Sequence, residues 1–360
     1  MPQDENFLPK YHKCTNFGRI RVLQGWEKNH SRWDTNLNTT IVNLLNGKVS
    51  LEQYVHLKLL DYPEAEEVWH NQAPLQKDFF GKLKTLVVEN CNFLSNVIPS
   101  YLVPYLKKLK KLQVKNCIQA EVIFDINAMN TATIKEESFP LEMLILDMLP
   151  NLKHVWNTDP EGIISFQNLQ EVQVTRCKHL KNLFTTSLSK KLGKLEKLTI
   201  ESCETMKEIV RKDEATVEGI TTEFVFPWLT LLVISDMPEL KFFFAGRYNL
   251  VCKNLKILRV YHCGKLEIFA LNSQIYQEGQ AEDYECDTGS LFNAQPLFSI
   301  QKVIPKLEEV SLNKKEAMML WHEESKEALL HNIKCLQLYC FHIVSEADSF
   351  HLDSFLRYPK

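Results

Sequence analysis

Cysteine and histidine are the side chains with which this sequence of 360 residues could do chemistry. The cysteines that recur at regular spacing are Cys91, Cys117, Cys177, Cys203 and Cys263. His179 lies two residues after Cys177, and His262 directly precedes Cys263. Cysteine with histidine can bind zinc or form a nucleophilic pair, and two neighbouring thiols can form a disulfide.

The spacing argues against metal binding and catalysis. Zinc sites bring cysteines together in C-x-x-C blocks, whereas Cys91 and Cys117 are 26 residues apart, and Cys335-x-x-x-x-Cys340 has no second pair. No third group is evident that would orient His262 as a base. The motifs G-x-x-x-x-G-K-[ST], G-x-S-x-G and H-E-x-x-H are absent from the sequence. We therefore expect no catalytic residue, no metal and no cofactor, and interpret the chain as a protein other than an enzyme.

The regular cysteines belong to a repeated motif, L-x-x-[LV]-x-[VI]-x-x-C. Its copies begin at Leu83, Leu109, Leu169, Leu195 and Leu255. This is the leucine-rich-repeat consensus, with cysteine at its Asn/Cys position. The central x-L-x-L-x pattern alternates as in a half-buried strand, and one such strand cannot bury its apolar face alone. Successive units must therefore stack, with the leucines in a continuous core and the x residues facing solvent.

A second unit ends in proline instead of cysteine. Its copies begin at Tyr54, Leu141 and Leu229, with a degraded one at Leu307. The order Pro-unit, Cys-unit, Cys-unit recurs, since Leu83 to Leu169 and Leu169 to Leu255 are both 86 residues. This nesting indicates duplication of a three-repeat block. Leu255 and Leu307 are 52 residues apart, which is long enough for two units, but the sequence shows only one there. A last weak copy begins at Ile333.

These repeats predict an α/β fold, a leucine-rich-repeat solenoid shaped as a curved horseshoe. A parallel β-sheet would form the concave face, with short helices and irregular loops on the convex face. We expect the cysteines to form a buried ladder, Cys117 beside Cys91 and Cys203 beside Cys177, as reduced thiols that bond weakly to turn backbone rather than as disulfides. Aromatic residues at matching positions are predicted to pack on the convex side: Trp69, Trp156, Phe243, Phe244 and Trp321.

The predicted organisation has three parts. Residues 1–53 form an irregular N-terminal segment, a remnant repeat or cap, because terminal repeats are atypical. Residues 54–345 form the solenoid of about ten units, with an acidic insertion near 272–295 that we expect to be a mobile surface loop. Residues 346–360 form a tail.

Composition limits the partners. The net charge of −3 favours neither nucleic acid nor an anionic membrane. No apolar run is long enough for a membrane span, and the N-terminus lacks the pattern of a secretory signal. Ten cysteines without a secretory route suit a reducing compartment, so we predict a cytoplasmic location, with the nucleus also possible.

Two repeat segments resemble a known family. Leu195-Glu-Lys-Leu-Thr-Ile-Glu-Ser-Cys203 and Leu149-Pro-Asn-Leu-Lys-His-Val-Trp156 are similar to the C-terminal repeats of plant coiled-coil NB-LRR disease-resistance proteins, as is Trp33–Ile41 to a segment between repeat blocks. The resemblance implies an intracellular immune-receptor module that senses a pathogen effector or a modified host protein and restrains a nucleotide-binding switch. The ATP-binding loop and coiled coil of the family are missing from this sequence, which indicates a detached repeat region.

The resemblance and the repeat phase together predict a protein-recognition module of plant innate immunity that binds through its concave face. The predicted contact residues are Lys111, Gln113, Lys115, Glu171, Gln173, Thr175, Lys197, Thr199, Glu201, Ile257, Arg259 and Tyr261. Arg259 and Tyr261 come first, because arginine and tyrosine are enriched in binding hot spots. Two alternatives stay open: an intramolecular regulatory part that restrains a separately encoded nucleotide-binding domain, and an F-box-type adaptor.

Overall fold

The computed structural model describes residues 19–22, 52, 54–60, 78–92, 94–127, 137–212, 220–270, 295–299, 304–313, 316–317 and 332–339. Most of the predicted N-terminal segment and acidic insertion, the predicted tail, and residues Trp69 and Trp321 lie outside these ranges. No description of them follows.

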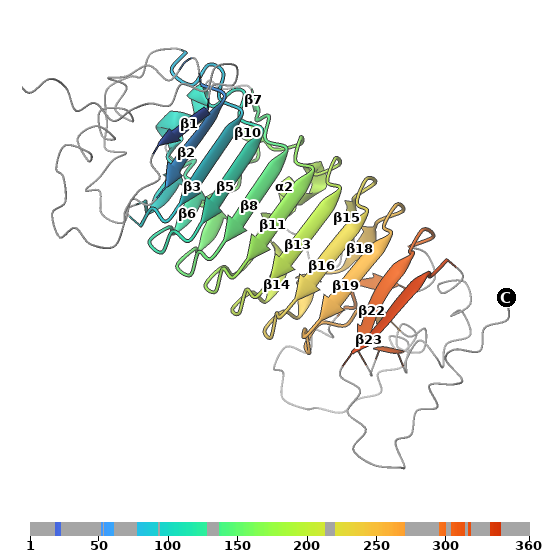
Figure 1. Ribbon diagram of the computed structural model, residues 1–360. Helices are drawn as coiled ribbons and strands as arrows, with labels where there is room; N and C mark the ends of the chain where they lie inside the picture. Colours follow the sequence, from blue (N-terminus) through green and yellow to red (C-terminus); the bar gives the residue numbers. More distant parts are fainter. Residues whose placement is uncertain are drawn as a thin grey trace, which may run out of the picture.

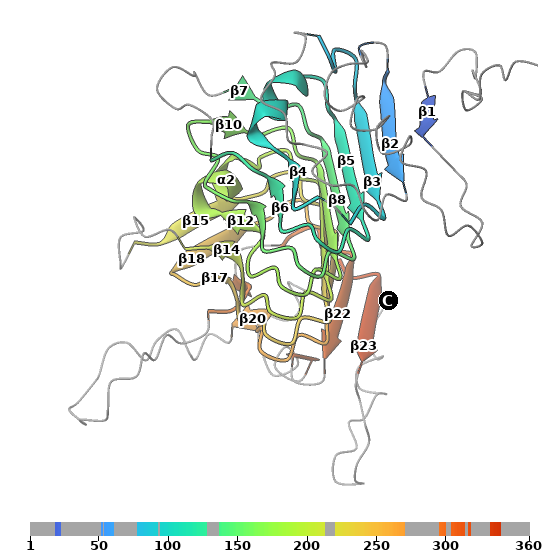
Figure 2. The ribbon, with the colours of Figure 1, turned by 90° about the vertical axis from the view of Figure 1, so that its left-hand side faces the viewer.

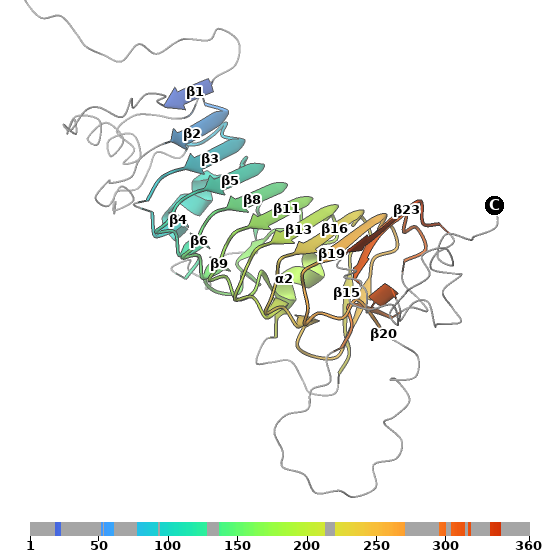
Figure 3. The ribbon, with the colours of Figure 1, turned by 60° about the horizontal axis from the view of Figure 1, so that its bottom comes forward.

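One parallel sheet of 11 strands runs through the described residues (Figures 1 and 3). In spatial order its strands are β1 (Arg19–Val22), β2 (His56–Leu60), β3 (Thr85–Glu89), β5 (Lys111–Lys115), β8 (Met143–Asp147), β11 (Glu171–Thr175), β13 (Lys197–Glu201), β16 (Leu231–Ser235), β19 (Ile257–Tyr261), β22 (Glu309–Asn313) and β23 (Cys335–Tyr339). From β2 onward each strand is the x-L-x-L-x segment of one repeat. The predicted leucine-rich-repeat solenoid is therefore confirmed.

The strands pair in register, so that equivalent repeat residues lie side by side. Leu112 is the partner of Leu86 on one side and Leu144 on the other, and Leu198 and Leu258 continue the same row. These leucines are buried, with exposed fractions of 3% or less. Burial of an apolar side chain of this size contributes roughly 1.5–3 kcal/mol, and no unit could obtain it without its neighbours.

A second, outer layer covers the leucine side of the main sheet (Figure 2). It consists of short parallel sheets: β4 (Asn96–Ile98), β6 (Val122–Phe124) and β9 (His154–Trp156); β12 (Phe184–Thr185), β14 (Glu208–Arg211) and β17 (Phe242–Phe244); β7 (Glu137–Ser138) and β10 (Ile164–Ser165); β15 (Thr222–Val225) and β18 (Tyr248–Val251); β20 (Phe269–Ala270) and β21 (Phe298–Ser299). The helices described in this layer are the 3-10 helix η1 (Ser100–Tyr105) and α2 (Thr186–Lys191). Short strands thus predominate over the predicted short helices.

The aromatic residues of the Pro-units fill the space between the two layers, as predicted. Trp156 on β9 packs against Phe166 with ring centroids 5.3 Å apart, and Phe244 on β17 packs against Phe224 at 5.3 Å. Phe243 is likewise buried. Ring packing from consecutive repeats therefore ties the outer layer to the leucine core.

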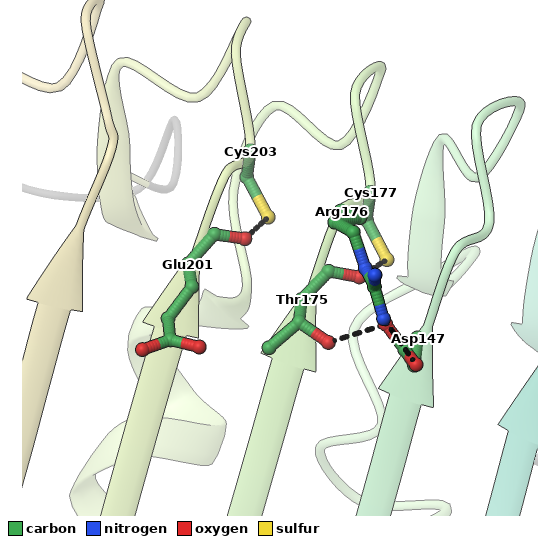
Figure 4. Close-up of polar contacts among 6 residues, drawn as sticks. All are labelled: Asp147, Thr175, Arg176, Cys177, Glu201 and Cys203. Carbon is green, nitrogen blue, oxygen red and sulfur yellow. Dashed lines mark hydrogen bonds and ion pairs between the residues drawn. The ribbon is translucent and has the colours of Figure 1, made fainter.

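The repeat cysteines form the predicted ladder of buried, free thiols. Each donates to the carbonyl oxygen two residues earlier: Cys117 Sγ lies 3.3 Å from the Lys115 oxygen, and Cys177 and Cys203 lie 3.5 Å from theirs (Figure 4). Burial is the largest cause that raises the pKa of the Cys117 thiol to about 11 and that of Cys263 to about 12. The thiols therefore serve as small core groups that close the turn after each strand.

A left-handed backbone residue makes that turn. Directly after seven of the strands, a residue other than glycine has φ between 49° and 57°: Asn90, Asn116, Met148, Arg176, Ser202, Asp236 and His262. Its N–H still donates to the next strand, as from Asn116 to the Asp147 oxygen at 2.9 Å. Asparagine tolerates this conformation best among non-glycine residues, whereas methionine does not.

The long interval between Leu255 and Leu307 adds no strand to the main sheet among the described residues. β19 pairs directly with β22, and only three residue pairs are in register there, Ile257–Arg259 with Glu309–Ser311. Other junctions, such as β16 with β19, pair all five. The sheet is thus partly open at the point where the sequence loses its spacing.

Replacing Met148 with glycine should stabilise the protein. Met148 is 42% exposed and has φ 55°, so the substitution removes left-handed strain and little packing. The strain costs about 1–2 kcal/mol and glycine loses about 0.5–1 kcal/mol of chain entropy, so a net gain of several tenths of a kcal/mol is expected, measured as a higher thermal midpoint. Met143→Gly, in the middle of the sheet, is the control and should lower the midpoint. Equal destabilisation by both variants would contradict the strain.

Burial of the thiols should make them resistant to alkylation. The thiolate is the reactive form, and with the pKa of Cys263 raised to about 12, less than about 0.1% is ionised at pH 8. In the native protein, iodoacetamide should modify exposed Cys335 and leave Cys117, Cys252 and Cys263 intact, as read by peptide mass spectrometry. All four should react in guanidinium. Rapid native labelling of Cys117 would show that the ladder is open to solvent.

Candidate functional site

The concave face is the side of the main sheet that points away from the outer layer. It is built from the first, third and fifth residue of each strand, which the parallel register aligns in three rows across the sheet. Each strand thus contributes three side chains that the core does not require. All twelve predicted contact residues occupy these rows.

The predicted residues form three separate groups rather than one patch. Those on β11 and β13 are adjacent, and Lys197 Nζ lies 3.5 Å from Glu171 Oε2. β8 separates this group from Lys111, Gln113 and Lys115 on β5, and β16 separates it from β19. The sequence prediction omitted β8 and β16 because it drew the face mainly from Cys-units. The phase of the Pro-units, with Leu144 and Leu232 inward, would have supplied them.

The expectation that Thr175 is accessible is wrong. Its exposed fraction is 6%, and its hydroxyl donates to Asp147 Oδ1 at 2.7 Å (Figure 4). Arg176 Nη2 donates to both oxygens of the same carboxylate, at 2.7 Å to Oδ1 and 2.8 Å to Oδ2. Burial alone would raise the pKa of Asp147, but the hydrogen bonds from Thr175 and Arg176 and the arginine charge lower it below its usual value. Asp147, Thr175 and Arg176 therefore form a polar cluster at the ends of β8 and β11 in which the carboxylate is hydrogen-bonded within the chain.

The two omitted strands bring apolar side chains to the concave face. Met143 and Ile145 occupy the first and third positions of β8, and Leu231 has the first position of β16, next to Ile257 on β19. These four are half-buried. Apolar groups at positions where the leucine core does not need them suit contact with another molecule.

Arg259 and Tyr261, the residues predicted first, are engaged within the chain. Arg259 Nε donates to Glu309 Oε1 on β22 at 2.6 Å. The Tyr261 ring meets the edge of Tyr339, with centroids 5.7 Å apart. The Tyr339 hydroxyl donates to the carbonyl of Val260, in the part of β19 where pairing with β22 has ceased. These side chains thus help to close the partly open junction, a role that the repeat pattern alone did not indicate.

A hollow lies at the other end of the concave face, over β2, β3 and β5. We call it the N-terminal hollow; its volume is about 380 Å³, and it is lined by His56, Lys58, Leu60, Thr85, Val87, Glu89, Lys111 and Gln113. Lys111 and Gln113 were predicted as contact residues, whereas the lining residues of β2 and β3 were not. Both strands follow the repeat phase, so the same alternation would have placed them on this face.

The described residues do not assemble a metal or nucleophile site. Among them, no group of three or more His, Cys, Asp and Glu side chains could hold a metal ion. His262 Nδ1 lies 2.8 Å from Asp236 Oδ1, but the neighbouring Cys263 is buried with a raised pKa, the opposite of an activated thiolate. None of the described helices is long and apolar enough to cross a membrane.

Comparison with known proteins agrees with the fold. A family described as plant disease resistance protein RPS2-like, leucine-rich repeats, matches residues 53–204. A probable disease resistance protein of Arabidopsis thaliana, At5g47260, is 31% identical over 123 residues, which are 34% of this chain and 12% of that relative. No solved structure matches.

The chain therefore spans only a small part of this curated relative, and the match concerns the repeats. The residues that the family model matches include β2 through β13. The predicted resemblance is confirmed: residues 53–204 are similar to the leucine-rich repeats of plant disease-resistance proteins.

Proposed function

We propose that this chain is a protein-recognition module of plant innate immunity, which senses a pathogen effector or a modified host protein through the concave face of its repeats. The proposal is supported chiefly by the half-buried apolar residues on the open face of β8, β16 and β19 (Met143, Ile145, Leu231 and Ile257). A solvated face of the same fold needs none of them. Binding of a protein would remove them from water, with roughly 25 cal/mol gained per Å² of apolar area.

The size of the face fits a protein rather than a small ligand. A strand of five residues measures about 17 Å, and neighbouring strands are about 4.8 Å apart, so each adds about 80 Å² of projected area. A standard interface covers about 800 Å² per partner. A partner must therefore extend over many of the strands, and its contacts would combine the apolar strands with the polar side chains of β11 and β13.

The charged groups of the face would contribute more to the orientation and selection of such a partner than to its affinity. Lys197 and Glu171 already form an ion pair in the chain without a partner, as do Arg259 and Glu309. Exposed pairs of this kind contribute about 0.2–1 kcal/mol. Affinity would come mainly from the apolar side chains, and selectivity from charges that a wrong partner leaves unpaired.

Alanine at Met143 and Ile257 together should weaken capture of the partner. Tagged protein would be expressed in healthy and infected leaves, co-purifying proteins identified, and the affinity of the recovered partner measured. We expect a loss of at least tenfold, which corresponds to about 1.4 kcal/mol. The matched control is Val225→Ala with Asn249→Ala, which removes exposed side chains from the outer-layer strands β15 and β18. Equal binding by both double variants would remove the concave face as the binding site.

The same purification separates sensing from intramolecular restraint. Recognition of an effector or modified host protein predicts a partner enriched in infected tissue. A nucleotide-binding domain recovered equally from healthy and infected leaves, and lost with the Met143 and Ile257 variant, would instead favour the regulatory alternative.

A further inference from the structure

Several lysines on the flanks of this solenoid pair with a glutamate on an adjacent repeat. Equivalent positions on adjacent strands are only about 4.8 Å apart, so opposite charges in one column meet. The pairs include Lys110 with Glu142 at 2.6 Å, Lys153 with Glu121 at 2.8 Å, Lys178 with Glu204 at 3.0 Å, Lys265 with Glu239 at 2.6 Å and Lys334 with Glu308 at 2.7 Å. A lysine whose column holds an acid on the adjacent repeat can therefore form an ion pair across the two repeats.

Three concave lysines at or beside the N-terminal hollow form no such pair among the described residues. Lys58 on β2 and Lys111 and Lys115 on β5 each lack a carboxylate within ion-pair distance among the described residues. In register, Lys58 lies beside Val87, and Lys111 lies between Thr85 and Met143, so their columns offer no acid.

Lys115, beside the hollow, has acidic neighbours, and its charge helps to lower the pKa of Asp147. It lies between Glu89 and Asp147 in register, and Asp147 is bound by Thr175 and Arg176. The hollow itself is lined by two lysines, Lys58 and Lys111, and one carboxylate, Glu89, so its lining is positive on balance.

The lining of the hollow is apolar between these charges. Leu60 is half-buried and Val87 is 6% exposed, and the two lie on the adjacent strands β2 and β3. Lys58 and Lys111 are two strands apart and offset by two residues along the strand, so their Cα atoms are about 12 Å apart. This is close to the distance of about 13 Å between residues i and i+4 of an extended peptide, whose side chains lie on the same face. A ligand that satisfies both features carries carboxylates at that spacing and an apolar side chain between them.

We propose that the N-terminal hollow binds an acidic protein segment in which an apolar side chain lies between carboxylates. The inference rests on the proposed function, because it names the chemistry of the partner at one end of the same face. A nucleic acid fits less well, since no Phe, Tyr or Trp side chain lines the hollow to stack on its bases.

The test is titration of the full chain with the peptide Glu-Ser-Leu-Ser-Glu, acetylated and fluorescently labelled, by anisotropy; its two carboxylates and the leucine between them share one face of the extended chain. Binding is expected, and it should weaken as ionic strength rises. Peptides with Gln in place of Glu, or Ser in place of Leu, should bind at least tenfold more weakly. An oligothymidylate strand serves as the nucleic-acid probe, and tighter binding of that strand than of the peptide would overturn the proposal.

The variant Lys58→Glu with Lys111→Glu should lower peptide affinity at least tenfold. Its matched control is Lys207→Glu with Lys241→Glu, which makes the same change of net charge at exposed positions on the outer surface. A milder pair, Lys58→Gln with Lys111→Gln, should give an intermediate loss and guards against misfolding of the reversed variant. Equal peptide binding by the concave and control variants would refute the hollow as the site.

The two proposals fail separately. If the peptide does not bind while the Met143 and Ile257 variant still loses its captured partner, only the acidic-segment proposal is wrong. If no concave substitution changes the affinity for the captured partner, the proposed function is wrong, whether or not the peptide binds.

Discussion

The in-register parallel pairing of successive five-residue strands is the constraint on which the rest of this structure depends. It places Leu86, Leu112 and Leu144 side by side, and it does the same for every other position of the repeat. The leucine core, the thiol ladder, the ion-pair columns and the three concave rows are therefore consequences of one backbone arrangement. A shift of one residue at any junction would turn apolar residues outward and break all four at once.

The turn after each strand shows how this constraint is maintained at a conformational cost. A left-handed residue lets its N–H stay in the ladder, as at Arg176, whose N–H donates to the Glu201 oxygen at 2.9 Å. The chain then reverses direction so that the following Cys177 enters the core and donates to Thr175. Side chains of these turn residues also interact across repeats, as in the 2.6 Å bond from Asn116 to Asn90. Cross-repeat bonds of this kind offset part of the strain that residues such as Met148 carry alone.

The sequence predicted the features that repeat and missed those that connect one unit to a different one. Spacing placed Leu198 and Cys203 correctly because their environment is copied from unit to unit. Burial of Thr175 depends on Asp147, which belongs to a Pro-unit, so the Cys-unit consensus contained no sign of it. Tyr339 reaches Val260 across β22 only because the junction between β19 and β22 is incomplete. The N-terminal hollow likewise arises from the combination of β2, β3 and β5 rather than from any one repeat.

The two ends of the concave face consequently differ in how many of their side chains already have partners within the chain. At the C-terminal end the cation of Arg259 is matched by Glu309, and the aromatic rings of Tyr261 and Tyr339 contact each other, so a ligand gains little there without displacing existing contacts. At the N-terminal end Lys58 and Lys111 have no carboxylate within ion-pair distance among the described residues, so an incoming carboxylate would not have to displace one. Because unsatisfied charge acts over about 8 Å at physiological ionic strength, this end would orient an approaching acidic partner before the apolar residues of β8 and β16 make contact. Along the solenoid, the unpaired lysines of the hollow come first, the apolar strands second, and the Tyr261–Tyr339 contact last. This order would set the direction in which a partner lies on the sheet.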